Sequence, residues 1–83
     1  MVTTIDEAVS VDLVSSASQK RVFPYVLNWR GRRYVIQKVG LHHVVRDGRV
    51  LMHIFAVTDG NQFFRLEFNT ETLLWRLTQI ASS

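Results

Sequence analysis

Three arginines crowd one short segment of this chain and raise the question of phosphate binding. Residues 29–34 read WRGRRY and hold Arg30, Arg32 and Arg33 around a single glycine. Guanidinium groups fit phosphate oxygens, and aromatic faces stack on unpaired bases, so the segment could contact nucleic acid. The alternative is a solubilising turn between two strands. The expected strand pairing favours the turn, because it places both flanking aromatic rings in the core.

Two more arginines are expected on the outer face of the last hairpin. There Arg65 would lie opposite Arg76, with Glu67 diagonal to Arg76. This set is either a surface charge ladder of small energetic value or a basic strip able to hold a phosphate backbone or an acidic peptide. The arginines that a nucleic-acid-binding function would use are Arg30, Arg32, Arg33, Arg65 and Arg76.

The three histidines could provide metal chemistry. The expected hairpin sets His42 opposite His53, close enough for two imidazoles to share a metal ion, while His43 points to the other face. No third ligand is expected nearby, so we predict no metal site and no cofactor. Protonation of the pair could still tune a dimer at mildly acidic pH.

Catalytic signatures are missing from the sequence. It contains no cysteine, no close pair of carboxylates, no glycine-rich phosphate loop and no His-x-x-x-His. Asp47 and Asp59 are explained as turn formers. The serines before residue 19 lie in a weakly structured leader, where no base could be held against them. We therefore predict that the protein is not an enzyme.

Length and composition indicate one globular domain. The chain has 83 residues, of which 47% are hydrophobic and 20% charged. The absence of cysteine suits the cytoplasm. No apolar run approaches a membrane span, and the acidic start of the chain is wrong for a signal peptide. Residues 1–19 carry a net charge of −3 and residues 20–83 carry +6. A basic body with an acidic leader can bind polyanions, or the leader can fold back onto the body.

The leader, residues 1–20, is predicted to be a short helix or a frayed arm. Thr4 and Glu7 have the spacing of a capping box. The residues that would share one helical face are Ile5, Ala8, Val9 and Leu13.

Residues 21–83 are predicted to form an all-β domain. From Arg21 the hydrophobic pattern has a period of two, and turn residues interrupt it. The expected strands are 22–29, 33–45, 50–58, 62–68 and 73–80. All connections are too short for a parallel crossover. We therefore expect a five-stranded antiparallel meander, as a strongly bent sheet or half-open barrel, with the N-terminal helix or arm beside it.

Turn positions predict the register of three hairpins. A turn at Asp47–Gly48 pairs His42 with His53, and a loop at 69–72 pairs Phe68 with Leu73. A turn at Gly31–Arg32 pairs Trp29 with Tyr34, and Leu27 with Ile36. The expected core is Tyr25, Leu27, Trp29, Tyr34, Ile36, Leu51, Phe55, Val57, Phe64, Leu66, Phe68, Leu73, Trp75 and Leu77.

The other face of the second and third expected strands is also apolar. It carries Val35, Val39, Leu41, Val45, Val50, Met52, Ile54 and Ala56. An antiparallel sheet with one solvent-exposed face should carry polar residues there, and not a row of apolar side chains. The sheet could curl at Gly40, the leader could cover this row, or a second copy of the chain could pack there; we favour the last two. The predicted interface anchors are Val39, Leu41, Met52 and Ile54.

The chain resembles a group of small uncharacterised bacterial β domains through four features: the pattern Trp29-Arg30-Gly31-Arg32-x-Tyr34-x-Val/Ile, a central Asp-Gly hairpin, Phe64-Arg65-Leu66 and a closing Trp75-Arg76-Leu77. The likeness covers residues 23–80. Some members of that group occur beside DNA-polymerase-like proteins of the lesion-bypass type, so the resemblance implies nucleic-acid proximity but supplies no site residues. The sequence thus predicts a non-catalytic interaction module that self-associates or docks a protein partner, with no membrane association. The alternative is a module that binds nucleic acid.

Overall fold

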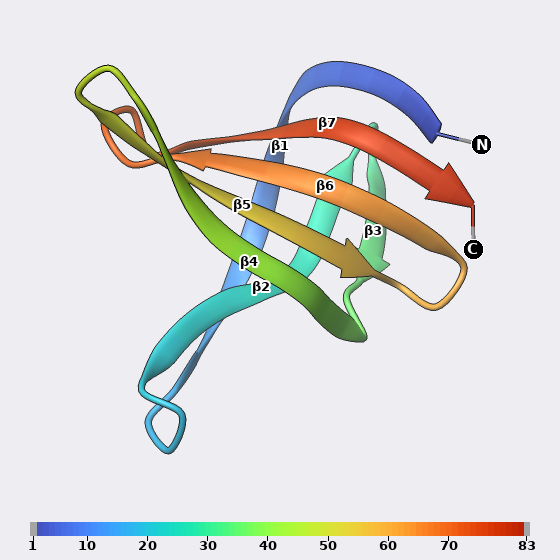
Figure 1. The fold of residues 1–83 in the computed structure, drawn as a ribbon. Coiled ribbons are helices and arrows are strands. Elements are labelled where there is room, and N and C mark those ends of the chain that lie inside the picture. Colours follow the sequence, from blue (N-terminus) through green and yellow to red (C-terminus); the bar gives the residue numbers. More distant parts are fainter. Residues whose placement is uncertain (1, 83) are drawn as a thin grey trace.

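The computed structural model describes residues 2–82, and its regular structure is entirely β (Figure 1). The all-β, antiparallel prediction is confirmed, but the number of strands is seven and not five. The strands are β1 (Val2–Ser16), β2 (Arg21–Trp29), β3 (Arg32–Val35), β4 (Lys38–Asp47), β5 (Val50–Thr58), β6 (Gln62–Asn69) and β7 (Leu74–Ser82).

The N-terminal segment is the long strand β1, so the predicted helix is wrong. Its first half pairs with β7 and its second half pairs with β2, which places it inside the sheet. The sheet order is β3-β2-β1-β7-β6-β5-β4. Val9 and Val11 pack against the core. This alternation of valines has the period of a strand, and β-branched residues favour strands over helices.

The sheet folds over on itself, so that β2 and β3 lie behind β5 and β6 (Figure 1). The rings of Tyr34 on β3 and Phe64 on β6 have centroids 5.3 Å apart, although three strands separate β3 from β6 in the sheet order. Register shifts occur between Thr4 and Glu7 and between Asp12 and Leu13 on β1, and such irregularities bend and twist a sheet. The result is two facing layers with one core between them.

The expected strand 33–45 is divided at residues 36 and 37. The Ile36 N–H donates to the Tyr25 carbonyl at 2.8 Å, and the Gln37 N–H donates to the Thr58 carbonyl at 2.8 Å. The chain therefore leaves β2 and joins β5 within two residues. β3 and β4 become the two edges of the sheet, and their junction ties the layers together.

The core fills the space between the layers. The core cluster comprises Leu27, Ile36, Phe55, Val57, Phe64, Leu66, Trp75 and Leu77. All eight were predicted from the period-two pattern. Trp29, Tyr34 and Phe68 pack against this cluster and are partly buried.

All three predicted hairpin registers are wrong by two residues. Trp29 pairs with Arg32, His42 with Phe55, and Phe68 with Trp75. The tight turns sit at Arg30–Gly31 and Gly48–Arg49; Arg30, Gly31 and Gly48 have positive φ. A shift by an even number leaves every side chain on its predicted face. This explains why the core was predicted well although the pairs were not.

Three residues of the predicted core are exposed. Tyr25 sits at the register shift of β2 against β1, Leu51 pairs with Arg46 near the tip of the β4–β5 hairpin, and Leu73 lies in the β6–β7 turn with a φ of 61°. Ile54, predicted on the second apolar face, is buried. At these four residues, burial depends on the position of the residue along its strand as well as on the face to which its side chain points.

Candidate functional site

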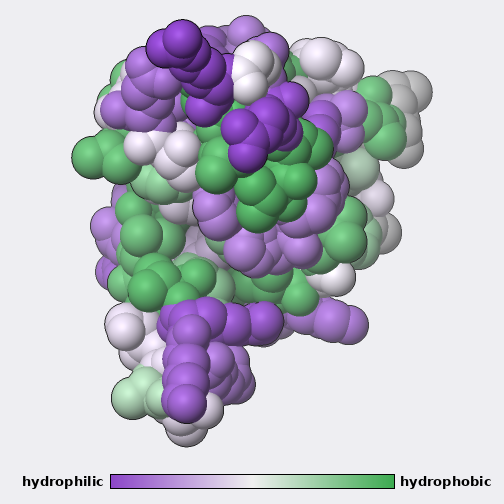
Figure 2. Space-filling view, turned by 60° about the vertical axis from the view of Figure 1, so that its left-hand side comes forward, coloured by the Kyte–Doolittle hydropathy of each residue, from purple (hydrophilic) through white to green (hydrophobic). Residues whose placement is uncertain are grey.

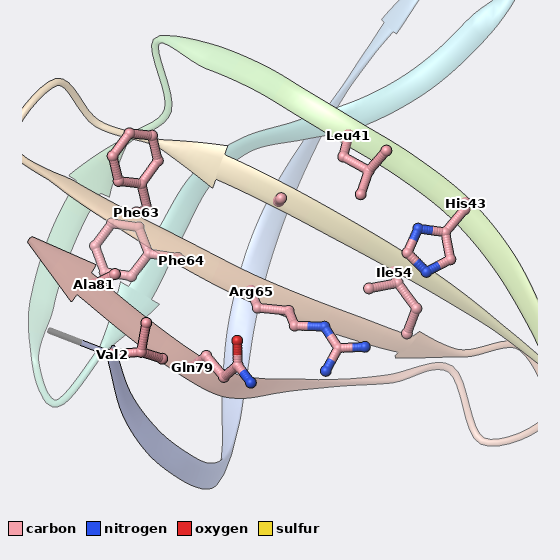
Figure 3. A pocket seen from close by; sticks show the side chains of 10 residues that line it. Val2, Leu41, His43, Ile54, Phe63, Phe64, Arg65, Gln79 and Ala81 are labelled. Atoms are coloured by element: carbon pink, nitrogen blue, oxygen red, sulfur yellow. The ribbon is translucent and has the colours of Figure 1, made fainter. Parts of the chain in front are cut away.

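The predicted second apolar face contains an open groove, here called the outer groove. It runs across β4 to β7 and has a volume of about 200 Å³. Figure 3 shows Leu41 and His43 of β4 beside Ile54 of β5, with the Arg65 side chain extending along the face from β6. The remaining apolar lining includes Val2, Ala56, Phe63 and Ala81. Ile54 is 3% exposed, whereas Leu41 is 53% exposed and Phe63 is 48% exposed.

The structure separates the four predicted interface anchors. Leu41 and Ile54 line the outer groove, and Met52 is half-buried. Val39 instead packs against the core cluster. The register shift between Val39 and Leu41, at Gly40, turns this part of β4 toward the interior. The N-terminal segment does not cover the groove, apart from Val2 at its end.

Strand β4 forms a long, open edge beside this groove. It has ten residues, and in the described part of the chain it pairs only with β5. Nine of the ten residues are exposed, including Leu41, Val44 and Val45. An exposed edge strand presents unpaired backbone N–H and C=O groups, which are a template for adding another strand.

Arg30, the first of the predicted phosphate-binding residues, is held by Glu7. Its Nε and Nη2 atoms donate to the two Glu7 carboxylate oxygens at 3.2 and 2.5 Å. The Trp29 indole N–H donates to the same carboxylate at 3.0 Å, and the Arg30 guanidinium lies 4.8 Å from the Trp29 ring centroid. The hydrogen bonds from Arg30 and Trp29 lower the pKa of Glu7, and the same pairing raises the pKa of Arg30. The acidic leader thus folds onto the arginine turn.

Two more of the predicted arginines also have carboxylate partners. Arg76 donates to the Asp6 carboxylate at 2.5 Å, and Arg65 lies 3.7 Å from the Glu67 carboxylate. The expected opposition of Arg65 and Arg76 is wrong, because Arg76 pairs with Glu67 and Arg65 pairs with Gln79 in the observed register. Such pairing reduces the positive charge that these side chains can offer a phosphate.

Arg32 and Arg33 are different. Both are exposed on the edge strand β3, and neither forms a salt bridge within residues 2–82. Three of the five predicted arginines therefore contact carboxylates, whereas Arg32 and Arg33 are exposed without a salt bridge in the described residues, next to the paired Arg30.

A second hollow, here called the opening, lies at one end of the space between the two layers. It has a volume of about 400 Å³. Figure 2 shows hydrophobic surface between the hydrophilic tips of the β1–β2 hairpin, at the bottom, and the β4–β5 hairpin, at the top. The residues that line the opening are Leu13, Arg21, Val22, His42, His53, Phe55, Phe68 and Trp75. The sequence reasoning missed Leu13, Arg21 and Val22 as site residues, although Val9, Val11 and Leu13 alternate as a strand would require.

The opening holds the predicted histidine pair. His42 lies opposite Phe55 and not His53, yet its Nε2 atom is 2.8 Å from His53 Nδ1 across the diagonal. The His42 ring stacks on Phe55 with centroids 4.2 Å apart and planes within 7°. Burial lowers the pKa of His42, and the nearby positive groups His53 and Arg21 lower that pKa further. The neutral form of His42 is therefore favoured, and a neutral imidazole can donate or accept the hydrogen bond that joins it to His53.

Within residues 2–82, no group of three or more His, Cys, Asp or Glu side chains could hold a metal ion. His43 does point to the opposite face, as predicted, where it lines the outer groove. A search of the same residues finds no helix that could cross a membrane. Comparison of the chain with protein-family models, with curated proteins and with solved structures found no match. The resemblance to the bacterial β domains stays a prediction.

Proposed function

We propose that this chain is a non-catalytic interaction module that self-associates by adding β4 of one copy to β4 of another. The observation that supports this proposal best is the ten-residue edge strand β4, which is exposed along nine residues and carries apolar side chains. Monomeric proteins protect such edges with charges, proline or short strands. β4 has charged residues only near its ends, at Lys38, Arg46 and Asp47.

The faces and charges of β4 suit pairing with itself. In an antiparallel pair that keeps each face continuous, residue numbers in opposed pairs sum to an even number. A pair centred on His43 sets Leu41 opposite Val45 of the second copy, both on the outer face. Arg46 then lies opposite Gly40 of the second copy, so no like charges are opposed. The outer grooves of the two copies then lie side by side on one face of the extended sheet, where Leu41 of each copy is opposite Val45 of the other.

The test is oligomeric state as a function of concentration, measured by sedimentation velocity. We expect a dimer that dissociates on dilution, and a variant with Leu41→Glu and Val45→Glu that stays monomeric. Leu74→Glu is the matched control, because Leu74 is 62% exposed but lies on β7. If the parent chain stayed monomeric up to about 0.5 mM, the Kd of any dimer would be too weak for a specific interaction, and the proposal would be overturned.

A second candidate function, nucleic-acid binding, is favoured by one observation. Arg32 and Arg33 are adjacent, exposed and without salt bridges in the described residues. Fluorescence anisotropy with a labelled single strand tests this candidate. Binding should weaken with a log–log salt slope of about 0.7 per phosphate contacted, and Arg32→Gln with Arg33→Gln should reduce both affinity and slope. Equal binding by the double variant would remove this turn from consideration.

A further inference from the structure

We propose that the opening is a binding site for a flat aromatic monoacid, with the ring among the aromatic side chains and the anionic group toward Arg21. This site lies between the two layers, whereas the outer groove lies on the opposite face of the β4–β7 sheet. The proposal is therefore independent of self-association.

The size and lining of the opening fit a small organic molecule. A volume of about 400 Å³ falls in the range of small-ligand sites, which are mostly apolar and have a few polar groups. Leu13 and Val22 from the β1–β2 hairpin form one wall, and both are about half exposed. Without an occupant, this wall leaves apolar side chains facing water next to the hydrophobic core.

The other wall is aromatic. The Phe68 and Trp75 rings have centroids 4.8 Å apart, and Phe55 and Trp75 have centroids 5.6 Å apart. Phe55 and Trp75 are nearly buried, so their positions are fixed by the core. Preorganised aromatic faces favour a flat aromatic ligand, because tilted and offset ring pairs add to the free energy of apolar burial.

The charge around the opening is positive. Among residues 2–82, Arg21 is the one fully charged side chain that lines the opening, and none of the lining residues is an aspartate or a glutamate. Arg21 lies over the Phe23 ring at 5.6 Å, and no salt bridge of residues 2–82 includes it. A guanidinium without a carboxylate at the edge of an apolar pocket complements a ligand with a single anionic group.

The histidine pair couples this site to pH. The positive groups that act on His42 are Arg21 from β2, His43 from its own strand and His53 from β5. A bound anion would offset their repulsion and favour protonation of His42. The pKa of His42 in the free protein lies below its ordinary value of 6.5, so binding of an anion should strengthen as the pH falls toward and below that value.

The experiment compares 1-naphthoate with its neutral analogue 1-naphthamide. Titrations are followed by calorimetry and by NMR of the two tryptophan indole N–H signals. Trp75 lines the opening, whereas Trp29 donates to Glu7 elsewhere and is the internal reference. We expect 1-naphthoate to shift the Trp75 signal, with an affinity about tenfold higher than that of 1-naphthamide, as for one charge-assisted hydrogen bond.

Variants assign the roles within the site. Arg21→Gln should weaken 1-naphthoate binding about tenfold and leave 1-naphthamide binding unchanged. Arg33→Gln, an exposed arginine on β3, is the matched control and should change neither. Val22→Glu places a carboxylate on the exposed rim and should abolish 1-naphthoate binding without touching the core. The monomeric variant with Leu41→Glu and Val45→Glu should bind 1-naphthoate as the parent does.

Three results would overturn the proposal. The first is no binding of 1-naphthoate at millimolar concentration. The second is equal affinity for the acid and the amide, which would exclude an anion site. The third is a larger shift of the Trp29 signal than of the Trp75 signal, which would place the ligand elsewhere.

Discussion

Replacing Leu73 and Leu77 with alanine, one at a time, distinguishes the observed β6–β7 register, in which Phe68 pairs with Trp75, from the register in which Phe68 pairs with Leu73. Leu77 is fully buried, opposite Leu66 in the core cluster. Leu73 is 68% exposed and lies in the turn with a φ of 61°, whereas the shorter register would pair it with Phe68 in the core. The same chemical change, leucine to alanine, should thus have very different costs.

The expected magnitudes follow from burial. Leu77→Ala should lower the free energy of unfolding by about 2–5 kcal/mol, the cost of removing a fully buried leucine side chain. A domain of this size has a total stability of about 4–12 kcal/mol, so the effect is a large fraction of the whole. Leu73→Ala should change the free energy of unfolding by less than about 0.5 kcal/mol, as for other exposed positions.

Urea unfolding, followed by tryptophan fluorescence and by far-ultraviolet circular dichroism, measures both variants. A slope of about 1 kcal/mol per molar urea means that Leu77→Ala should move the midpoint by about 2 M or more. If this variant lacks a folded baseline, Leu77→Val removes one methylene and should cost about 1 kcal/mol. A loss for Leu73→Ala as large as that for Leu77→Ala would refute the assigned register.

Two further predictions concern residues outside the core, Glu7 and Gly60. Glu7 has a lowered pKa in the folded protein, so its carboxylate stabilises the fold above its ordinary pKa of 4.5, and this stabilisation is lost as the pH falls through the lower folded value. The difference in melting temperature between the parent and Glu7→Gln should therefore shrink as the pH falls from 7 to below 4.5; a constant difference would contradict the pairing with Arg30. Gly60→Ala should lower the free energy of unfolding by about 1 kcal/mol, because φ is 98° there and L residues rarely adopt it. The added Cβ would lie 2.9 Å from Gln37 Oε1, but that amide is the end of a flexible, exposed side chain and can move away. Gly31→Ala, which has a φ of 75° and open space around the Cβ, should therefore cost about the same, and a much larger loss for Gly60→Ala would contradict a freely moving Gln37.

The sequence predicted the core far better than it predicted the strand pairs. The period-two pattern identifies which residues share a face, so Phe55, Phe64 and Trp75 were assigned correctly. Register depends on which residues adopt positive φ in the turn. Arg30 has a φ of 51°, although non-glycine residues seldom adopt that conformation. A turn at Gly31–Arg32 would have avoided a positive φ at Arg30. The observed turn is nevertheless Arg30–Gly31, in the register that pairs Trp29 with Arg32.

The N-terminal strand was the largest error. Thr4 and Glu7 have capping-box spacing, but Glu7 accepts hydrogen bonds from Trp29 and Arg30, which lie 22 and 23 residues further along the chain. Spacing alone cannot distinguish a local partner from a distant one. The opening was missed for the same reason, because its two walls come from hairpins that the sequence treats as unrelated.

Among the site residues, one contact within a hairpin was predicted, whereas contacts between residues far apart in the sequence were not. His42 and His53 were predicted as neighbours, and they are, through a diagonal contact. The five arginines were grouped by residue type, but type does not reveal that Asp6 and Glu7 reach across the sheet to Arg76 and Arg30.

The pairing of β1 with β7 makes the order of folding different from the order of the chain. β1 is near the middle of the sheet, yet Val2 pairs with Ala81, so this contact joins two ends of the described chain. The other pairings join strands that follow one another in sequence and need only short loops to close. Because long-range closure is the slower step, β1–β2–β3 and β4–β5–β6–β7 should form first as two separate meanders. During synthesis, the part of β1 that pairs with β7 would remain unpaired until β7 emerges. This part of β1 is therefore the segment most open to mispairing with another nascent chain.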